Sequence, residues 1–161
     1  MLICSCLTVR AQLDDKKTIF SDHYLGAAAG FSTGYGLSYR YWPGKFGGQF
    51  TFAPYCDPFE IQLSTGLSLL YKVKSYGKVN LFLYQGNHIY YYGRHWELWK
   101  GKLTVEEGYG RQFHGLGFGL EFVILKRLSL NLMTGYSMSK WFGDNEWLLN
   151  MTGETGIYFR L

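Results

Sequence analysis

Apolar and polar residues alternate one by one along much of the chain. In segment 147–161 the odd-numbered positions are mostly apolar, and the even-numbered positions from 150 onward are mostly polar or small. Successive residues of a β-strand point to opposite faces, so this period of two predicts a strand with one apolar and one polar face. The same alternation recurs in segments 61–73, 115–124 and 128–139.

Weaker versions of the pattern divide the rest of the chain into further strands, which gives eight in all. The connections between them alternate between tight turns, as at 43–45 and 126–127, and longer segments, above all 93–110. Transmembrane β-barrels show this alternation of short and long connections. The connection near 33–34 is short and departs from the rule. The predicted strands are 23–32, 35–42, 46–54, 60–73, 78–92, 111–125, 127–139 and 147–161.

Composition and strand length agree with a barrel that crosses a membrane. The 161 residues include 21 Gly and 19% aromatic residues, and aromatic residues favour strands. No stretch reaches the roughly 18 consecutive apolar residues of a spanning helix, whereas most predicted strands reach the about 9–11 residues that a tilted spanning strand needs. Only helices and closed barrels satisfy their backbone groups in lipid.

Alternation by itself does not say which face of the barrel points inward. A soluble barrel places its apolar face inward, and a transmembrane barrel places it outward. The long strands, the small residues of the polar face and the scarcity of charge on the apolar face favour the second arrangement. We therefore predict an all-β fold, an eight-stranded antiparallel up-and-down transmembrane β-barrel. In it Leu130, Leu132, Leu149 and Met151 face lipid, and Asn131, Asn150 and Thr152 face the lumen.

The N-terminal segment has the character of a truncated signal peptide. Residues 1–9 are largely apolar, and the chain turns abruptly polar after Ala11. This pattern predicts a leader over 1–11, a short periplasmic segment over 12–21 and a barrel domain over 22–161. Removal of the leader takes Cys4 and Cys6 away and leaves Cys56 without a disulfide partner.

Two segments carry a resemblance to a known group. The run from Gly36 to Trp42, followed by Pro43-Gly44-Lys45, and the C-terminal run from Gly156 to Leu161 resemble the small outer-membrane β-barrels of the OmpA and OmpX type, especially those of the Bacteroidetes group. The resemblance implies export through the periplasm to the outer membrane of a Gram-negative cell. It also implies a monomer in contact with outer-membrane lipid and lipopolysaccharide. The barrel-insertion machinery would read Ile157, Phe159 and Leu161, although a terminal Leu departs from the usual aromatic residue.

The polar face carries charges that are costly to bury singly. We expect them to pair, with Arg40 bound to Glu121 or Glu154 and no continuous water path beside them. Two interpretations stay open: a salt-bridged plug that fills the narrow lumen, or a selectivity gate. The residues of this expected network are Arg40, Lys72, Glu121, Glu154 and Arg160.

The long connection 93–110 contains two β-prone runs around Lys100-Gly101-Lys102, which is a hairpin signal. It predicts that the fifth and sixth strands continue beyond the membrane as a protruding ribbon. Its apolar side chains form a binding patch, or else they pack on each other or sit in lipopolysaccharide. These side chains are Trp96, Leu98, Trp99, Leu103 and Val105.

Motifs that carry chemistry are not apparent. The four histidines have no partners at metal-ligand spacing, the Gly115-x-Gly117-x-Gly119 run lacks a following helix, and no nucleophile and base stand out on neighbouring strands. Basic residues are scattered, which argues against nucleic-acid binding. We expect no cofactor, metal or catalytic residue. The favoured role is structural or surface interaction through the outer loops, followed by a narrow conduit for small or apolar solutes, and then a lipid-modifying enzyme.

Overall fold

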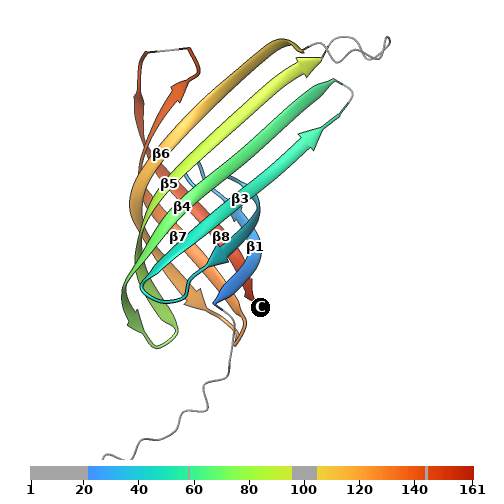
Figure 1. The fold of residues 1–161 in the computed structure, drawn as a ribbon. Coiled ribbons are helices and arrows are strands. Elements are labelled where there is room, and N and C mark those ends of the chain that lie inside the picture. The colour runs from blue at the N-terminus through green and yellow to red at the C-terminus, as the bar shows by residue number, and fades with distance from the viewer. Residues whose placement is uncertain (1–21, 58, 96–104, 144) are drawn as a thin grey trace, which may run out of the picture.

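The computed structural model describes residues 22–57, 59–95, 105–143 and 145–161. They form eight strands in one closed antiparallel barrel, in which each strand pairs with its neighbours in sequence and β8 returns to pair with β1 (Figure 1). The predicted fold class is therefore confirmed. The expected leader and periplasmic segment lie outside the described residues. Among the described residues there is no helix with the length and apolar character needed to cross a membrane.

The strand boundaries lie within three residues of the predicted ones, except at the start of the sixth strand. The sixth strand begins at Val105, six residues earlier than expected, and pairs with the fifth out to His95. The predicted extension of this hairpin is thus present up to that pair. The strands are β1 His23–Ala29, β2 Gly36–Tyr41, β3 Phe46–Cys56, β4 Glu60–Tyr76, β5 Val79–His95, β6 Val105–Val123, β7 Leu128–Trp141 and β8 Leu148–Arg160.

The two ends of the barrel differ in their connections. One end, called the turn end here, holds the start of β1, the end of β8 and the tight turns after β2, β4 and β6 (Figure 1). The turn after β4 places Gly77 at φ 57°, a backbone conformation that glycine adopts without steric cost. The opposite end, called the loop end, holds the connections after β1, β3, β5 and β7, and all of these except the one after β3 are longer than the turns.

The apolar faces of the strands point outward. Leu132 is 50% exposed and Met151 is 73% exposed, whereas Asn131 and Thr152 are buried in the interior. This is the facing predicted from alternation, and it is the reverse of a soluble barrel. Asn150 also points inward, but it lies exposed at the loop-end rim, beside the inward-facing Ser137.

The wall of the barrel has unequal height. β1 and β2 have 7 and 6 residues, whereas β4, β5 and β6 have 17, 17 and 19. β1 ends where Ala29 pairs with Thr155, and β2 begins where Leu37 pairs with Phe52. Beyond these pairs β8 keeps its pairing with β7 and β3 keeps its pairing with β4 (Figure 1). The predicted strands 23–32 and 35–42 were too long, because the chain leaves the wall after Ala29.

Candidate functional site

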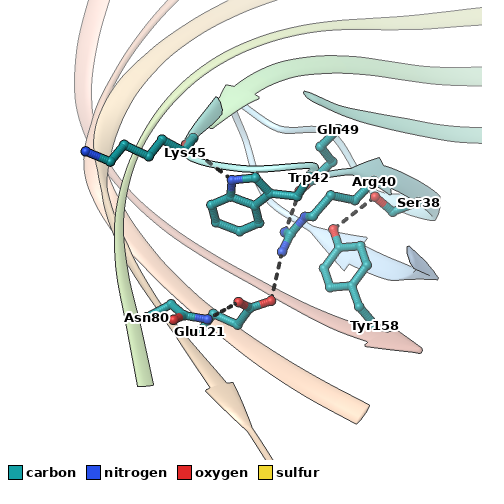
Figure 2. Close-up of polar contacts among 8 residues, drawn as sticks. All are labelled: Ser38, Arg40, Trp42, Lys45, Gln49, Asn80, Glu121 and Tyr158. Atoms are coloured by element: carbon teal, nitrogen blue, oxygen red, sulfur yellow. Dashed lines mark hydrogen bonds and ion pairs between the residues drawn. The ribbon is translucent and has the colours of Figure 1, made fainter. Parts of the chain in front are cut away.

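The turn-end half of the lumen is built around Arg40, on β2. Its side chain is fully buried, and one terminal nitrogen, Nη1, lies 3.6 Å from Oε1 of the buried Glu121 on β6 (Figure 2). The other terminal nitrogen, Nη2, donates a hydrogen bond of 2.7 Å to Oε1 of Gln49. Asn80 donates a 2.7 Å bond to Oε2 of Glu121. Arg40 therefore pairs with Glu121, one of the two partners expected for it.

Aromatic rings enclose the same guanidinium. The Cζ atom of Arg40 lies 3.9 Å from the centre of the Tyr158 ring and 5.3 Å from that of Trp42 (Figure 2). The Tyr158 hydroxyl in turn forms a 2.9 Å hydrogen bond with Ser38. In the amide orientation that satisfies both partners, the Asn131 carbonyl accepts hydrogen bonds from both terminal nitrogens of Arg40. A buried cation with this many partners holds β2, β6, β7 and β8 in one arrangement.

The remaining three charges of the expected network do not join this pair. Lys72 places its ammonium group 4.7 Å from the centre of the Trp42 ring. Arg160 lies at the partly exposed rim of the turn end, 3.3 Å from Asp22. Glu154 lies nearer the loop end, where it accepts hydrogen bonds from hydroxyls and from a backbone N–H. The prediction of one network of five residues was wrong, because β-strand register separates these charges into different levels of the lumen.

A short segment of backbone fills the lumen above the Arg40 pair. Residues 30–35, which connect β1 to β2, fold into the barrel and are called the plug here; Ser32 and Thr33 in it are 0% exposed. Oε1 of Glu154 accepts a 3.1 Å bond from the backbone N–H of Ser32, a short bond from its hydroxyl and a 3.1 Å bond from the Thr152 hydroxyl. The Tyr84 hydroxyl donates to the same oxygen at 3.4 Å. This carboxylate therefore anchors the plug to β8.

Glycines of the opposite wall make room for the plug. A Cβ atom on Gly66 would lie 2.0 Å from the carbonyl oxygen of Thr33, and one on Gly86 would lie 2.5 Å from that of Ser32. A Cβ on Gly115 would lie 2.3 Å from the Ser32 side chain. The space beside Gly115 is taken by the side chain of Ser32, and the space beside Gly119 by the side chains of Phe82 and Met133. The inward-facing glycines at these three positions thus decide that a connection, rather than side chains, occupies this level.

A serine and a histidine meet at the edge of the plug. Oγ of Ser64, on β4, lies 2.9 Å from Nε2 of His88, on β5. The other ring nitrogen of His88 lies 2.8 Å from the carbonyl oxygen of Phe31, and Tyr35 donates its backbone N–H to Ser64 Oγ at 3.3 Å. The expectation that no nucleophile and base lie together on neighbouring strands was wrong, because the two residues are separated in sequence and only the register joins them.

This pair fastens the plug. Ser64 is completely buried, and the side chains of Ser64 and His88 each form a hydrogen bond with the backbone of residues 30–35. Since the His88 nitrogen beside the Phe31 carbonyl must carry the proton, the other nitrogen accepts from Ser64. Within the described residues no group of three or more His, Cys, Asp and Glu side chains could hold a metal ion.

Two cavities lie on either side of the filled level. One, of about 210 Å³, opens at the turn end between Asp22, Lys72 and Arg160. The other, of about 540 Å³, lies on the loop-end side of the plug. The fully buried side chains of Arg40, Phe82 and Tyr84, together with the plug, stand between them.

The remaining residues proposed from the sequence lie elsewhere. Ile157, Phe159 and Leu161 are exposed on the outer face at the turn end. Cys56, expected to be buried or in a loop, is exposed at the loop end of β3. Val105 pairs with His95 in the hairpin of β5 and β6. Trp96, Leu98, Trp99 and Leu103 lie outside the described residues.

Comparisons with known proteins bear on the fold. No protein-family model and no curated protein sequence matches the chain. The N-terminal β-barrel domain of Pseudomonas aeruginosa OprF is similar in structure, with a TM-score of 0.55 and 13% identity over 88% of this chain and 99% of that one. Neisserial surface protein A gives a TM-score of 0.54 and 14% identity over 88% of this chain and 98% of that one. At these identities the likeness establishes a shared small-barrel fold.

Proposed function

We propose that this chain is an outer-membrane β-barrel of the OmpA and OmpX type, of the kind common in Bacteroidetes. It is exported to the Gram-negative outer membrane as a monomer, with its turn end in the periplasm and its loop end outside. Its role is structural or surface interaction at the loop end, and it is not an enzyme. The observation that carries the proposal is the lumen, which is filled by the Arg40 pair and the plug.

The outward apolar face supports the membrane location. Leu67, Leu69 and Leu116 are each more than half exposed, as are many other apolar side chains of the barrel. Water would make such a surface an aggregation hazard, whereas bilayer hydrocarbon makes it favourable. The two similar barrels, a domain of Pseudomonas aeruginosa OprF and neisserial surface protein A, agree with this setting.

A filled lumen argues for interaction over transport. A barrel of eight strands has an interior just wide enough for its own side chains. Here Arg40 and Glu121 occupy one level, and the backbone of Ser32 and Thr33 occupies the next. A solute would have to displace both groups of contacts in order to cross.

A narrow conduit is the second candidate, and one observation favours it. The plug, which closes the lumen on the loop-end side, is a connection between two strands, and connections move more readily than the strands of the wall. Release of Ser32 from Glu154, together with release of Phe31 and Tyr35 from the Ser64–His88 pair, would leave only the Arg40 level in the way.

Fractionation and single-channel recording test these proposals together. The folded protein should partition with outer membranes and migrate faster on a gel unless it is heated. In a planar bilayer, the unaltered protein should give no conductance steps, and neither should Glu154→Ala, because the Arg40 level still closes the lumen. Frequent steps with the unaltered protein would favour the conduit, and recovery in the soluble fraction would refute the membrane location.

The non-enzymatic part of the proposal has its own test. A serine-reactive fluorophosphonate probe should not label the folded protein, since Ser64 is completely buried. Ser64→Ala should leave the lipid composition of membranes unchanged. Labelling that disappears in Ser64→Ala would instead assign Ser64 as a nucleophile.

A further inference from the structure

The loop-end cavity, called the cup here, is lined by aromatic side chains. Its floor is Phe31 of the plug, which lies 6.2 Å from the ring of Phe113, and its sides include Tyr35, Tyr90 and Trp141. With about 540 Å³ it falls within the roughly 300–1,000 Å³ typical of sites for small molecules. The lining is therefore suited to an apolar or aromatic occupant.

One positive charge lies in this apolar cup. Arg111 on β6 is flanked by Tyr90 on β5 and Trp141 on β7 in the strand register. Its guanidinium carbon lies 4.8 Å from the Trp141 ring and 5.1 Å from the Phe113 ring, and Nη2 donates a 2.7 Å bond to Ser139. In the described part of the chain no carboxylate pairs with Arg111, and its buried Nε has no hydrogen-bond partner.

This arrangement contrasts with the turn end, where Arg40 has Glu121. A guanidinium that is partly buried among aromatic rings gains most from an anion that accepts from its Nε and Nη atoms together. A carboxylate has that geometry and carries the single negative charge that one guanidinium balances. The cup therefore offers an anionic end and an apolar body to one ligand.

The low wall gives the cup a side opening toward the membrane. Above Ala29 and Leu37 the wall lacks β1 and β2, which leaves a gap, called the window here, between β8 residues 148–154 and β3 residues 53–56. Three strand spacings of about 4.8 Å separate β8 from β3 at its foot, or roughly 14 Å. The exposed apolar side chains of Leu149 and Met151 border the window, so this level belongs to the lipid-facing belt.

We propose that the cup binds one fatty acid from the membrane. Its carboxylate lies at Arg111, and its alkyl chain lies among Phe31, Phe113 and Trp141. It enters through the window, past Gly153, which lines the cup and where an added Cβ would meet nothing within 4 Å. This inference rests on the membrane location proposed above, but the site itself is tested independently of where the protein fractionates.

The test uses the full chain folded in lipid nanodiscs, with dodecanoate as the probe and backbone amide shifts as the readout. Dodecanoate should shift the amides of Gly30, Phe31 and Gly153 in a saturable manner, and leave Ser129 at the turn end unmoved. Dodecyltrimethylammonium, which has the same chain and the opposite charge, should not saturate these shifts.

Variants test the role of the Arg111 charge and the role of the window separately. Arg111→Met should weaken dodecanoate binding roughly 10- to 150-fold, as expected for loss of hydrogen bonds to a charged group. Arg111→Lys should have an intermediate affinity, because an ammonium group keeps the charge but lacks the paired Nε and Nη donors. Gly153→Phe should slow or block entry. The matched controls are Lys45→Gln, which removes an exposed positive charge at the turn end (Figure 2), and Leu149→Phe, which adds a ring on the same outer face of β8.

Three outcomes would overturn the proposal. In the first, dodecanoate shifts the amides of lipid-facing residues as much as those of the cup. In the second, Arg111→Met, shown to be folded by its heat-modifiable gel shift, binds dodecanoate with unchanged affinity. The third is equal binding of dodecanol, which has no charge. If the protein binds dodecanoate saturably but does not fractionate with outer membranes, the proposed fatty-acid site stands and the proposed membrane location is refuted.

Discussion

The two halves of the lumen are filled by different means. At the turn end all eight strands are paired around the ring, and side chains fill the space: Arg40 with Glu121, packed against Trp42 and Tyr158. At the loop end the wall lacks β1 and β2, and the backbone of residues 30–35 enters the barrel against glycines. A complete wall leaves room for side chains only, whereas an incomplete wall admits backbone and leaves a cup above it.

The difference concerns charge as well as shape. The turn-end arginine is neutralised within the protein, and the loop-end Arg111 has no carboxylate partner among the described residues. Burial of an unpaired charge is costly, so the turn-end pair serves stability while Arg111 is placed to receive an anion. The following predictions test this division, starting with the largest effect.

Arg40→Leu should lower the free energy of unfolding by about 3–5 kcal/mol, because it leaves Glu121 buried without a cation. Denaturant unfolding from lipid vesicles, followed by tryptophan fluorescence, measures it. The double variant Arg40→Leu/Glu121→Leu should recover much of the loss. If the single and double variants are equally unstable, the pair does not organise the turn-end half.

Leu132→Arg should cost about 2–4 kcal/mol, because Leu132 faces outward from the middle of β7, where a charge meets bilayer hydrocarbon. Leu125→Arg, in the exposed turn after β6, should cost only about 0–1 kcal/mol. The same unfolding assay compares the two. Equal costs would contradict the placement of the turn end at the membrane surface.

Glu154→Ala should lower the free energy of opening of the plug by about 1.5–3 kcal/mol, which is the typical contribution of hydrogen bonds to a charged acceptor. Hydrogen exchange should accelerate at the Ser32 amide and stay unchanged at Asn131, below the plug. Faster exchange at both amides would mean that the two halves open as one unit.

Arg160→Leu should have the smallest effect, about 0–1 kcal/mol, because its pair with Asp22 is partly exposed to water at the turn-end rim. A loss as large as that of Arg40→Leu would show that the rim pair stabilises the turn end as much as the buried pair does. Unfolding at low and high salt measures both variants side by side.

The amino-acid pattern determined the wall of this protein. Alternation with a period of two specifies strands and faces locally, so eight strands, their outward apolar side and the lumen position of Arg40 and Glu121 followed from the sequence. The weak contrast in segment 23–32, where Ala27 to Ala29 are alike, is where the predicted strand was too long. The hairpin signal in 93–110 likewise predicted that β5 and β6 extend, and their pairing continues to His95 and Val105.

The contents of the barrel were decided by tertiary structure. Ser64 and His88 lie 24 residues apart, and Ser32 and Glu154 lie 122 apart; each pair meets only because register and closure bring distant strands to one level. The sequence marked Gly66 and Gly86 as small, but it could not say that backbone would occupy the space beside them. A strand pattern records which face a residue takes, whereas its height in the lumen depends on the shear of all eight strands together.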